Sequence, residues 1–328
     1  MNTMTNLPIW PKAYPDTQAC ALLKSHNSDF KVTELPLCLP SGEGEHVWLY
    51  IEKNGANTAW VAQKLAALAK VKEQDVGFAG LKDRHAITKQ WFSVYLPKGA
   101  TPDFRVLNDA EITVLEQSRH SKKLRRGDLL GNRFEILLRE VQGDKSLIEA
   151  NLQRIAEQGV PNYFGAQRFG HDGGNIESGR AMLAREIRVN SATKKSLYLS
   201  AVRSFIFNEV LAKRIRLGLL GQTVAGDVLV DGEVTGPLWG RGRSSAQERA
   251  QELEQEVVQQ HAALCDGLEH AGLQQERRAL VARPEQFRWQ WLEGENVQLM
   301  LTFSLPSGYY ATSLINEILQ VSEPSEPA

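Results

Sequence analysis

The most informative part of the sequence is residues 77–91, GFAGLKDRHAITKQW. A short apolar run ends at Gly80, and a second strand-like run begins at Gln90. Asp83 therefore lies on a loop at the edge of a sheet, where loops on a rigid scaffold often carry functional residues. The cations on either side of Asp83 favour its ionised form, which suits a nucleophile facing a polyanionic substrate. The spacing alone equally fits a solvated turn whose Asp bonds its own backbone.

Composition sets broad limits on the protein class. The chain has 328 residues, 42% of them hydrophobic and 23% charged, enough for one large core or two. The net charge is −1, so any affinity for nucleic acid must come from local patches. No apolar run approaches the roughly 20 residues of a membrane span, and the first residues lack the features of a signal peptide. We therefore expect a cytoplasmic protein with no membrane association.

Cysteine and histidine usage gives no sign of a disulfide or metal framework. Cys20, Cys38 and Cys265 are widely spaced and form no pair motif. They are typical of reduced thiols in a cytosolic protein. The seven His residues show no metal-ligand spacing, so we expect no metal site.

Hydrophobic periodicity predicts an α+β fold. Residues 47–51 alternate as a strand,, and Asn57 or Thr58 can cap the amphipathic helix that follows. Further strands are expected on both sides of the Asp83 loop and over residues 134–138, and a helix over residues 147–155.

The middle of the chain has a different, helical pattern. Residues 197–217 predict a long helix, and Ser245 to Glu248 form a capping box that starts a second helix reaching about residue 270,. The strand pattern returns over residues 297–303, followed by a last helix. Strand signals on both sides of a helical block predict an inserted domain. Residues 322–328 are rich in Pro, Ser and Glu, and we expect them to be disordered,.

The Asp83 segment resembles the active-site motif of the tRNA pseudouridine synthase D family. A motif of this length with several flanking blocks is a specific signal. The other blocks that resemble the family are DFKVTE (29–34), GEGEH (42–46), KNGANT (53–58), GNRF (131–134), PNYFGAQRFG (161–170) and LPSGYYATS (305–313). The resemblance runs in order from about residue 20 to about residue 319. It implies a pseudouridine synthase catalytic domain with a mixed, mainly antiparallel sheet, formed by residues 1–158 and 284–328. An inserted, family-specific α+β domain is expected over residues 159–283.

The resemblance also implies roles for individual residues. Asp83 would be the nucleophile, while Phe30 stacks on the target uridine and Asn132 hydrogen-bonds to a base edge. A third base contact falls at Tyr310, where the family's better-known members carry Phe, so the added hydroxyl needs a partner or water. Lys24 and Glu34 flank the Phe30 segment as candidates for supporting roles.

A basic cluster precedes the GNRF block. Five fixed cations lie within eight residues, at Arg119, Lys122, Lys123, Arg125 and Arg126. Such a run is often a solvated face, but the resemblance favours contact with RNA phosphates. We call these five residues the basic patch.

The implied reaction is isomerisation of a uridine to pseudouridine in tRNA, with uridine 13 in the D-arm of tRNA-Glu as the target that the family suggests. Asp83 could assist departure of the base, or attack the sugar or the base. No cofactor, metal or obligate protein partner is expected. Two other classes are an RNA-binding module that has lost its chemistry, against which the intact Asp83 argues, and a glycosidase-like hydrolase. The hydrolase needs a second acid, for which Glu34 is the only near candidate.

Overall fold

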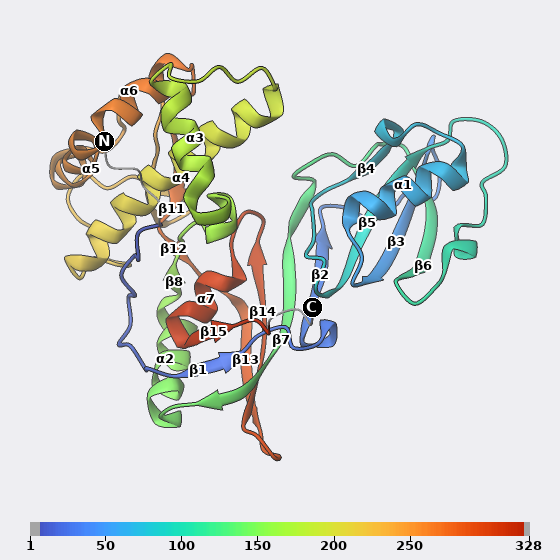
Figure 1. Ribbon diagram of the computed structural model, residues 1–328, viewed down its shortest axis with the longest axis horizontal. Coiled ribbons are helices and arrows are strands. Elements are labelled where there is room, and N and C mark those ends of the chain that lie inside the picture. Colours follow the sequence, from blue (N-terminus) through green and yellow to red (C-terminus); the bar gives the residue numbers. More distant parts are fainter. Residues whose placement is uncertain (1–6, 325–328) are drawn as a thin grey trace. The chain divides into compact units, whose positions relative to one another are not determined.

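Figure 1 shows the computed structural model, which describes residues 7–324. The chain forms two compact units. Unit 1 comprises residues 7–17, 146–283 and 309–318, and unit 2 comprises residues 18–145, 284–308 and 319–324. The predicted inserted domain, residues 159–283, falls inside unit 1, and its boundaries stay a prediction. Of the tail expected to be disordered, residues 325–328 lie outside the described residues.

Unit 2 is built around one large sheet. Its helices and strands are β1 (Cys20–Leu22), η1 (Asn27–Asp29), β2 (Phe30–Pro36), β3 (His46–Asn54), α1 (Thr58–Ala69), η2 (Glu73–Asp75), β4 (Val76–Phe78), β5 (Ile87–Tyr95), η3 (Phe104–Leu107), β6 (Ile112–His120), β7 (Leu129–Gln142), β13 (Glu285–Leu292), β14 (Gln298–Pro306) and β15 (Gln320–Ser322). The main strand order is β13-β14-β7-β2-β5-β3-β6. Among the described strands of this sheet, β2 pairs with β5 and β1 with β15 in parallel, and the other pairs are antiparallel. The predicted mixed, mainly antiparallel sheet of an α+β fold is confirmed.

Strand alternation separates the two faces of this sheet. On one face Leu49 and Ile51 of β3 and Phe92 of β5 pack with Val61 and Leu65 of α1 in a buried cluster. The same face continues across β2, β7 and β14 through the aligned residues Val32, Phe134 and Phe303, all of them buried. This is the face from which the Asp83 site is built.

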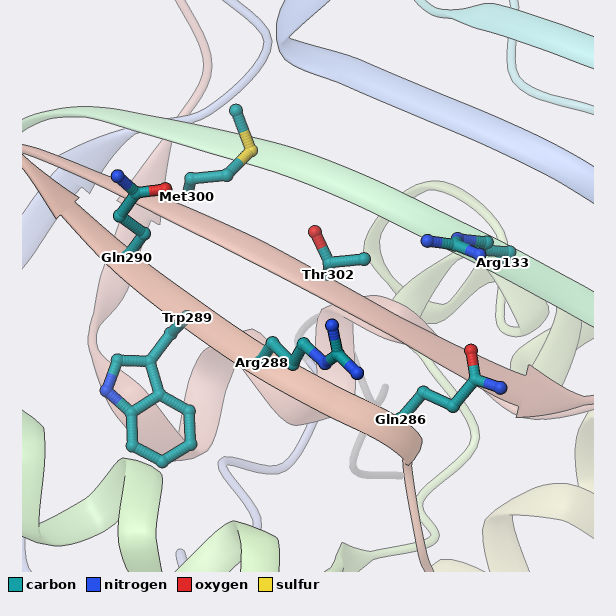
Figure 2. Close-up of a pocket in the computed structure, with 7 residues that line it drawn as sticks. All are labelled: Arg133, Gln286, Arg288, Trp289, Gln290, Met300 and Thr302. Atoms are coloured by element: carbon teal, nitrogen blue, oxygen red, sulfur yellow. The ribbon is translucent and has the colours of Figure 1, made fainter.

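The opposite face of the same sheet carries polar residues. Figure 2 shows a hollow there that is lined by Arg133, Gln286, Arg288, Trp289, Gln290, Met300 and Thr302. Its volume is about 600 Å³. Arg133 lies between Asn132 and Phe134 along β7 and so points to the side opposite theirs. The hollow is therefore separate from the surroundings of Asp83.

Unit 1 is mainly helical. Its elements are α2 (Lys145–Gln158, whose first residue belongs to unit 2), β8 (Val160–Pro161), η4 (Ala166–Arg168), η5 (His171–Gly173), α3 (Gly174–Leu183), α4 (Ala192–Arg216), β9 (Leu229–Val230), β10 (Glu233–Leu238), α5 (Glu248–Gln260), α6 (Ala262–His270), β11 (Glu276–Ala279), β12 (Val281–Ala282) and α7 (Ala311–Ile318). The core includes Phe205, Ile206 and Phe207 of the long helix α4. The helices predicted over residues 147–155 and 197–217 are confirmed as α2 and α4.

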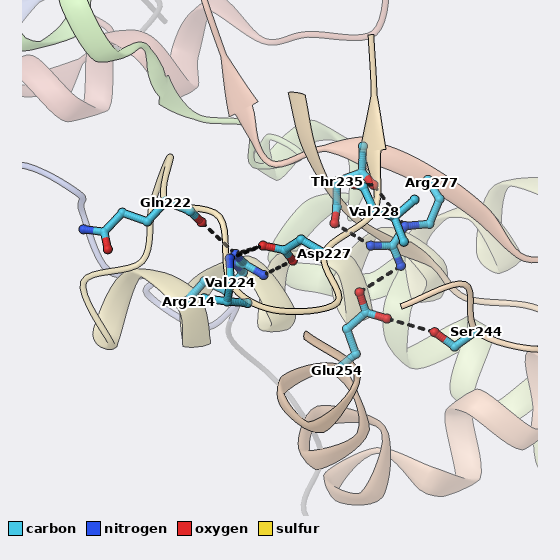
Figure 3. A network of polar contacts seen from close by, with 9 residues as sticks. All are labelled: Arg214, Gln222, Val224, Asp227, Val228, Thr235, Ser244, Glu254 and Arg277. Atoms are coloured by element: carbon cyan, nitrogen blue, oxygen red, sulfur yellow. Dashed lines mark hydrogen bonds and ion pairs between the residues drawn. The ribbon is translucent and has the colours of Figure 1, made fainter. Parts of the chain in front are cut away.

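A buried ionic network also lies within unit 1 (Figure 3). Arg214 donates two hydrogen bonds of 2.8 Å to the two carboxylate oxygens of Asp227. Their side chains are only 4% and 1% exposed. Arg277 pairs with Glu254 at 2.8 Å. We call both pairs closed, because the guanidinium of each faces the carboxylate of its partner inside the unit.

One predicted helix is wrong in its detail. The expected capping box at Ser245 does not form, because α5 begins at Glu248 after Gln247, whose side chain makes no capping bond. The neighbouring Ser244 instead donates from its hydroxyl to Glu254 at 3.3 Å. The expected single helix is two, because His261 takes φ −119° and ψ 31° and ends α5 before α6 begins.

The structural data also bear on the thiols and on membranes. Cys20 and Cys38 are exposed, Cys265 is buried, and all three are free thiols. Burial raises the pKa of the Cys265 thiol to about 12. Within residues 7–324, none of the helices has the length and apolar character needed to cross a bilayer.

Candidate active site

Asp83 lies in the loop between β4 and β5 of unit 2, as the sequence predicts, and its side chain is exposed. The backbone of this loop is held by buried polar side chains on the α1 face of the sheet. Gln90 of β5 donates from Nε2 to the carbonyl of Gly80 at 3.1 Å. Thr58, the first residue of α1, donates to Gln90 Oε1 at 3.1 Å and accepts from the backbone N–H of Lys82 at the same distance. The loop is therefore anchored just before Asp83.

A second anchor acts on Asp83 itself. Lys53 at the end of β3 is fully buried, and its ammonium donates to the carbonyls of Ala56 and Asp83 at 2.9 Å each. Burial lowers the pKa of Lys53 to about 8, while the charge of Asp83 opposes this shift. Within residues 7–324 this ammonium forms no salt bridge, so its burial is costly,. Its bond to the Asp83 carbonyl constrains the backbone of that residue.

A third set of contacts lies beside the loop. Glu34 of β2 is aligned with Asn132 of β7 on the same sheet face. Lys82 Nζ lies 2.7 Å from Asn132 Oδ1 and 3.1 Å from Glu34 Oε2. Burial raises the pKa of Glu34, and the charge of Lys82 and the Trp91 backbone N–H act against that rise. Because this carboxylate is only 1% exposed and already engaged, it is a poor second acid for a hydrolase.

Phe30 and Lys24 lie together. The Phe30 ring is 3% exposed and meets Phe134 edge-on, with 6.3 Å between ring centroids. The Lys24 ammonium lies 4.8 Å from the Phe30 centroid and pairs with Glu323 at 3.2 Å. The Lys24 side chain therefore lies over the Phe30 ring. Phe134 is a core residue, as its strand position predicts.

Tyr310 belongs to unit 1, so its place beside Asp83 stays a prediction. Within that unit the hydroxyl that distinguishes it from Phe has a partner. Arg168 donates to it from Nε at 3.2 Å and from Nη2 at 3.0 Å. The third donor of Arg168, Nη1, reaches the Ser200 hydroxyl at 3.2 Å.

The basic patch is less uniform than its sequence suggests. Arg119 donates to the Leu96 carbonyl at 2.6 Å and also to the Thr101 hydroxyl, and Lys123 donates to the Gln74 carbonyl. Arg126 lies 4.3 Å from the Phe78 ring centroid but remains exposed. Lys122 and Arg125 have exposed side chains. They border a hollow of about 640 Å³ that also contains Trp48 and His120.

Sequence reasoning missed Lys53, Gln90 and the second role of Thr58. A signal was present, because alternation places Lys53 in phase with the apolar Leu49 and Ile51 of the same strand. A charged residue at an inward strand position indicates a buried functional contact. The partner of Lys82 could not be found in this way, since it lies 50 residues further along the chain.

Comparisons with known proteins give a consistent result. The family model described as tRNA pseudouridine synthase D (TruD) matches residues 15–194 and 230–318. The chain is 45% identical to the tRNA pseudouridine synthase D of Aeromonas salmonicida, over 93% of this chain and 92% of that protein. It is 41% identical to the protein of that name from Hydrogenovibrio crunogenus, over 94% and 95% of the two chains.

A solved structure agrees in fold. The crystal structure of the putative tRNA pseudouridine synthase D from Methanosarcina mazei superposes with a TM-score of 0.72. It covers 96% of each chain at 20% sequence identity. The family match over most of the chain and the identity to curated relatives are decisive. The chain belongs to the tRNA pseudouridine synthase D family.

Proposed function

We propose that this protein isomerises a uridine in tRNA to pseudouridine, with Asp83 as the nucleophile. The observation that supports this most is the anchoring of the Asp83 loop. An exposed carboxylate lies on a loop whose backbone is bonded to Lys53 on β3, Thr58 on α1 and Gln90 on β5. Fixing a reactive group in this way lowers the entropic part of a barrier.

The reaction suits a site of this kind. The bond between N1 of uracil and C1′ of ribose breaks, a new bond forms between C5 and C1′, the hydrogen on C5 leaves as a proton, and N1 takes up a proton. Atoms and electrons balance without a redox partner. The exchange of the two bonds calls for a carboxylate close to the glycosidic bond, and Asp83 would supply it.

Recognition of the base would come from groups beside the loop. The target base must leave its stack in the RNA before an enzyme can act on it. Asn132 is half-buried beside Lys82 and would bond to the base edge,. Phe30 would supply a stacking face once Lys24 moves, and we propose Tyr310 as the second stacking ring.

The substrate would be gripped mainly through its phosphates, which dominate the affinity of proteins for nucleic acid. We assign this role to the exposed members of the basic patch, Lys122, Arg125 and Arg126, while Arg119 and Lys123 bond to the carbonyls of Leu96 and Gln74. The finer target that we propose is uridine 13 in the D-arm of tRNA-Glu.

The test uses tRNA transcripts labelled with tritium at C5 of uridine. The purified protein should release tritium to water, and the modified position should then be mapped by mass shift. Asp83→Asn should abolish release while tRNA affinity stays within about tenfold, since Asp83 makes no phosphate contact. Tight tRNA binding without release by the wild-type protein would indicate a binding module. Release of free uracil would indicate a glycosidase, and normal turnover by Asp83→Asn would remove the catalytic assignment.

A further inference from the structure

The contact between Lys82 and Asn132 bears on the orientation of the Asn132 amide as well as on its position. Lys82 is 5% exposed and Glu34 is 1% exposed. The ammonium lies between Glu34 Oε2 and Asn132 Oδ1, at 3.1 and 2.7 Å. Asn132 itself is half-buried. Within residues 7–324, its Nδ2 group has no hydrogen-bond acceptor.

The chemistry of lysine determines which way the amide points. A lysine ammonium has three donors and no acceptor, whereas an Asn amide has an oxygen acceptor on one side and an NH₂ donor on the other. Only the oxygen can face Lys82 favourably. The ion pair with Glu34 holds the ammonium in place, so the Asn132 amide cannot turn over without setting two donors against each other.

We propose that Lys82 is a positioning residue that locks the Asn132 amide with its NH₂ group toward the target base, and that this lock selects uracil over cytosine. The inference rests on the proposed function, in which Asn132 contacts the base. It adds a determinant of base identity that is located in the residue next to Asp83.

The two pyrimidines differ where this amide would read them. Uracil presents the O4 acceptor beside the N3–H donor. The locked amide presents NH₂ to O4, and the second lone pair of Oδ1 remains available for N3–H. Cytosine presents an NH₂ donor at C4 beside an acceptor at N3, so it needs the amide turned over. Lys82 opposes that turn.

The test measures binding of two tRNA transcripts that differ only in U or C at the mapped target position. The Asp83→Asn background prevents conversion of uridine during the measurement. Moderately raised salt reduces the phosphate contribution to both affinities. We expect the U transcript to bind more tightly by roughly 5- to 150-fold, the range for one well-made bidentate contact to a base.

Lys82→Met should remove this preference in a particular way. The freed amide can turn to suit either base, so the Kd for the C transcript should fall toward that for the U transcript. A merely structural role of Lys82 would instead weaken binding of both transcripts together. Lys89→Met is the matched control, because Lys89 also pairs with a glutamate, Glu52 at 3.3 Å, but belongs to the opposite sheet face. It should leave the ratio unchanged.

Asn132→Asp gives a second test that does not depend on losing the ion pair. The carboxylate retains a favourable partner in Lys82, so the fold should be kept, which thermal unfolding checks. Because both of its oxygens are acceptors, the carboxylate meets one donor and one acceptor on either base, N3–H and O4 of uracil or NH₂ and N3 of cytosine. The preference should therefore fall toward one. Adding Lys82→Met to Asn132→Asp should not change the preference further, since the two carboxylate oxygens are equivalent.

The outcomes separate this inference from the proposed function. Absence of tritium release by the wild-type protein would remove the proposed function itself. Normal release together with a U preference that survives Lys82→Met would overturn the lock while leaving that function intact. Equal effects of Lys82→Met with and without the Asn132→Asp substitution would also overturn it, because the lock acts only on an amide.

Discussion

Two buried polar clusters of this protein use similar chemistry for different ends. In unit 1, Arg214 with Asp227 and Arg277 with Glu254 form closed ion pairs inside the fold (Figure 3). In unit 2, Lys82 pairs with Glu34 but also reaches the half-buried amide of Asn132. Its neighbour along the chain is the exposed Asp83.

The difference shows what marks a functional cluster. A buried ion pair alone gives little evidence of function, because it often breaks even against its desolvation cost. The unit 2 cluster differs because Lys82 contacts the Asn132 amide, whose Nδ2 donor has no acceptor among residues 7–324. Lys53 is similar in this respect, because its buried ammonium donates a hydrogen bond to the carbonyl of the exposed Asp83.

An Asp→Asn substitution at Asp227 and at Asp83 should show the largest difference between the two clusters, in the free energy of unfolding. Asp227→Asn leaves the buried Arg214 guanidinium without its carboxylate, so the free energy of unfolding should fall by about 3–5 kcal/mol. Turnover per folded molecule should not change. Urea unfolding of both variants measures this, and Asp83→Asn, at an exposed position, should stay within about 0.5 kcal/mol of wild type. Similar stability losses in the two variants would contradict the distinction.

Lys53→Met should act on turnover. It removes the donor to the Asp83 carbonyl, and a reacting group displaced by about 1 Å costs up to about 100-fold. We expect turnover to fall by about 10- to 100-fold with tRNA affinity nearly unchanged. Single-turnover kinetics and binding measurements together give this split. Weakened tRNA binding with an unchanged chemical step would show that Lys53 does not position Asp83.

Lys53 should also leave a signature in the pH dependence of stability. Its pKa is lowered to about 8 in the fold, against about 10.4 in an unfolded chain. Between these values the unfolded state binds more protons, so the contribution of Lys53 to the free energy of unfolding rises with pH. The wild-type protein should gain about 2 kcal/mol relative to Lys53→Met from pH 7.5 to 9.5. A constant difference in urea unfolding between the two proteins would refute this.

The basic patch divides into solvent-facing and internal members, and substitution should reveal the division. Lys122→Ala with Arg125→Ala should reduce the slope of log affinity against log salt by about 1.4–1.8, since each phosphate contact contributes about 0.7–0.9. Arg119→Ala should leave the slope unchanged and lower stability, because its guanidinium bonds to the Leu96 carbonyl. An unchanged slope in the double variant would make the patch a solvated face.

The smallest effect is expected at Tyr310. Tyr310→Phe removes the acceptor that Arg168 uses twice, so the free energy of unfolding should fall by about 0.5–1.5 kcal/mol,. Turnover should stay within about threefold of wild type, because the ring is retained. Tyr310→Ala should lower turnover by the equivalent of about 1–3 kcal/mol, the usual loss of a base–aromatic stack. A damaging Phe beside a tolerated Ala would show that the hydroxyl matters and the ring does not.

The sequence by itself determined several of the helices and strands, the Asp83 loop and the family. The alternation over residues 47–51 and the apolar repeat of α4 are patterns within short segments. Such a pattern is enough to predict a strand or a helix. The motif around Asp83 is contiguous, so it could be identified without knowing the sheet order. The hydrogen bonds of Arg119 and Lys123 to backbone carbonyls could not be predicted, because a run of charges does not show which carbonyls will lie beside it.

Only the tertiary structure decided which groups the side chains of Thr58 and Lys82 contact. Sequence left Asn57 or Thr58 as the cap of α1. In the fold Asn57 caps the helix by accepting from the Ala59 N–H, which leaves the Thr58 hydroxyl to hold the Lys82 backbone. Lys82 meets Asn132 across 50 residues, and that meeting depends on the register of β2 with β7. Register is a property of strands that pair across the sheet, so no pattern within either segment could specify it.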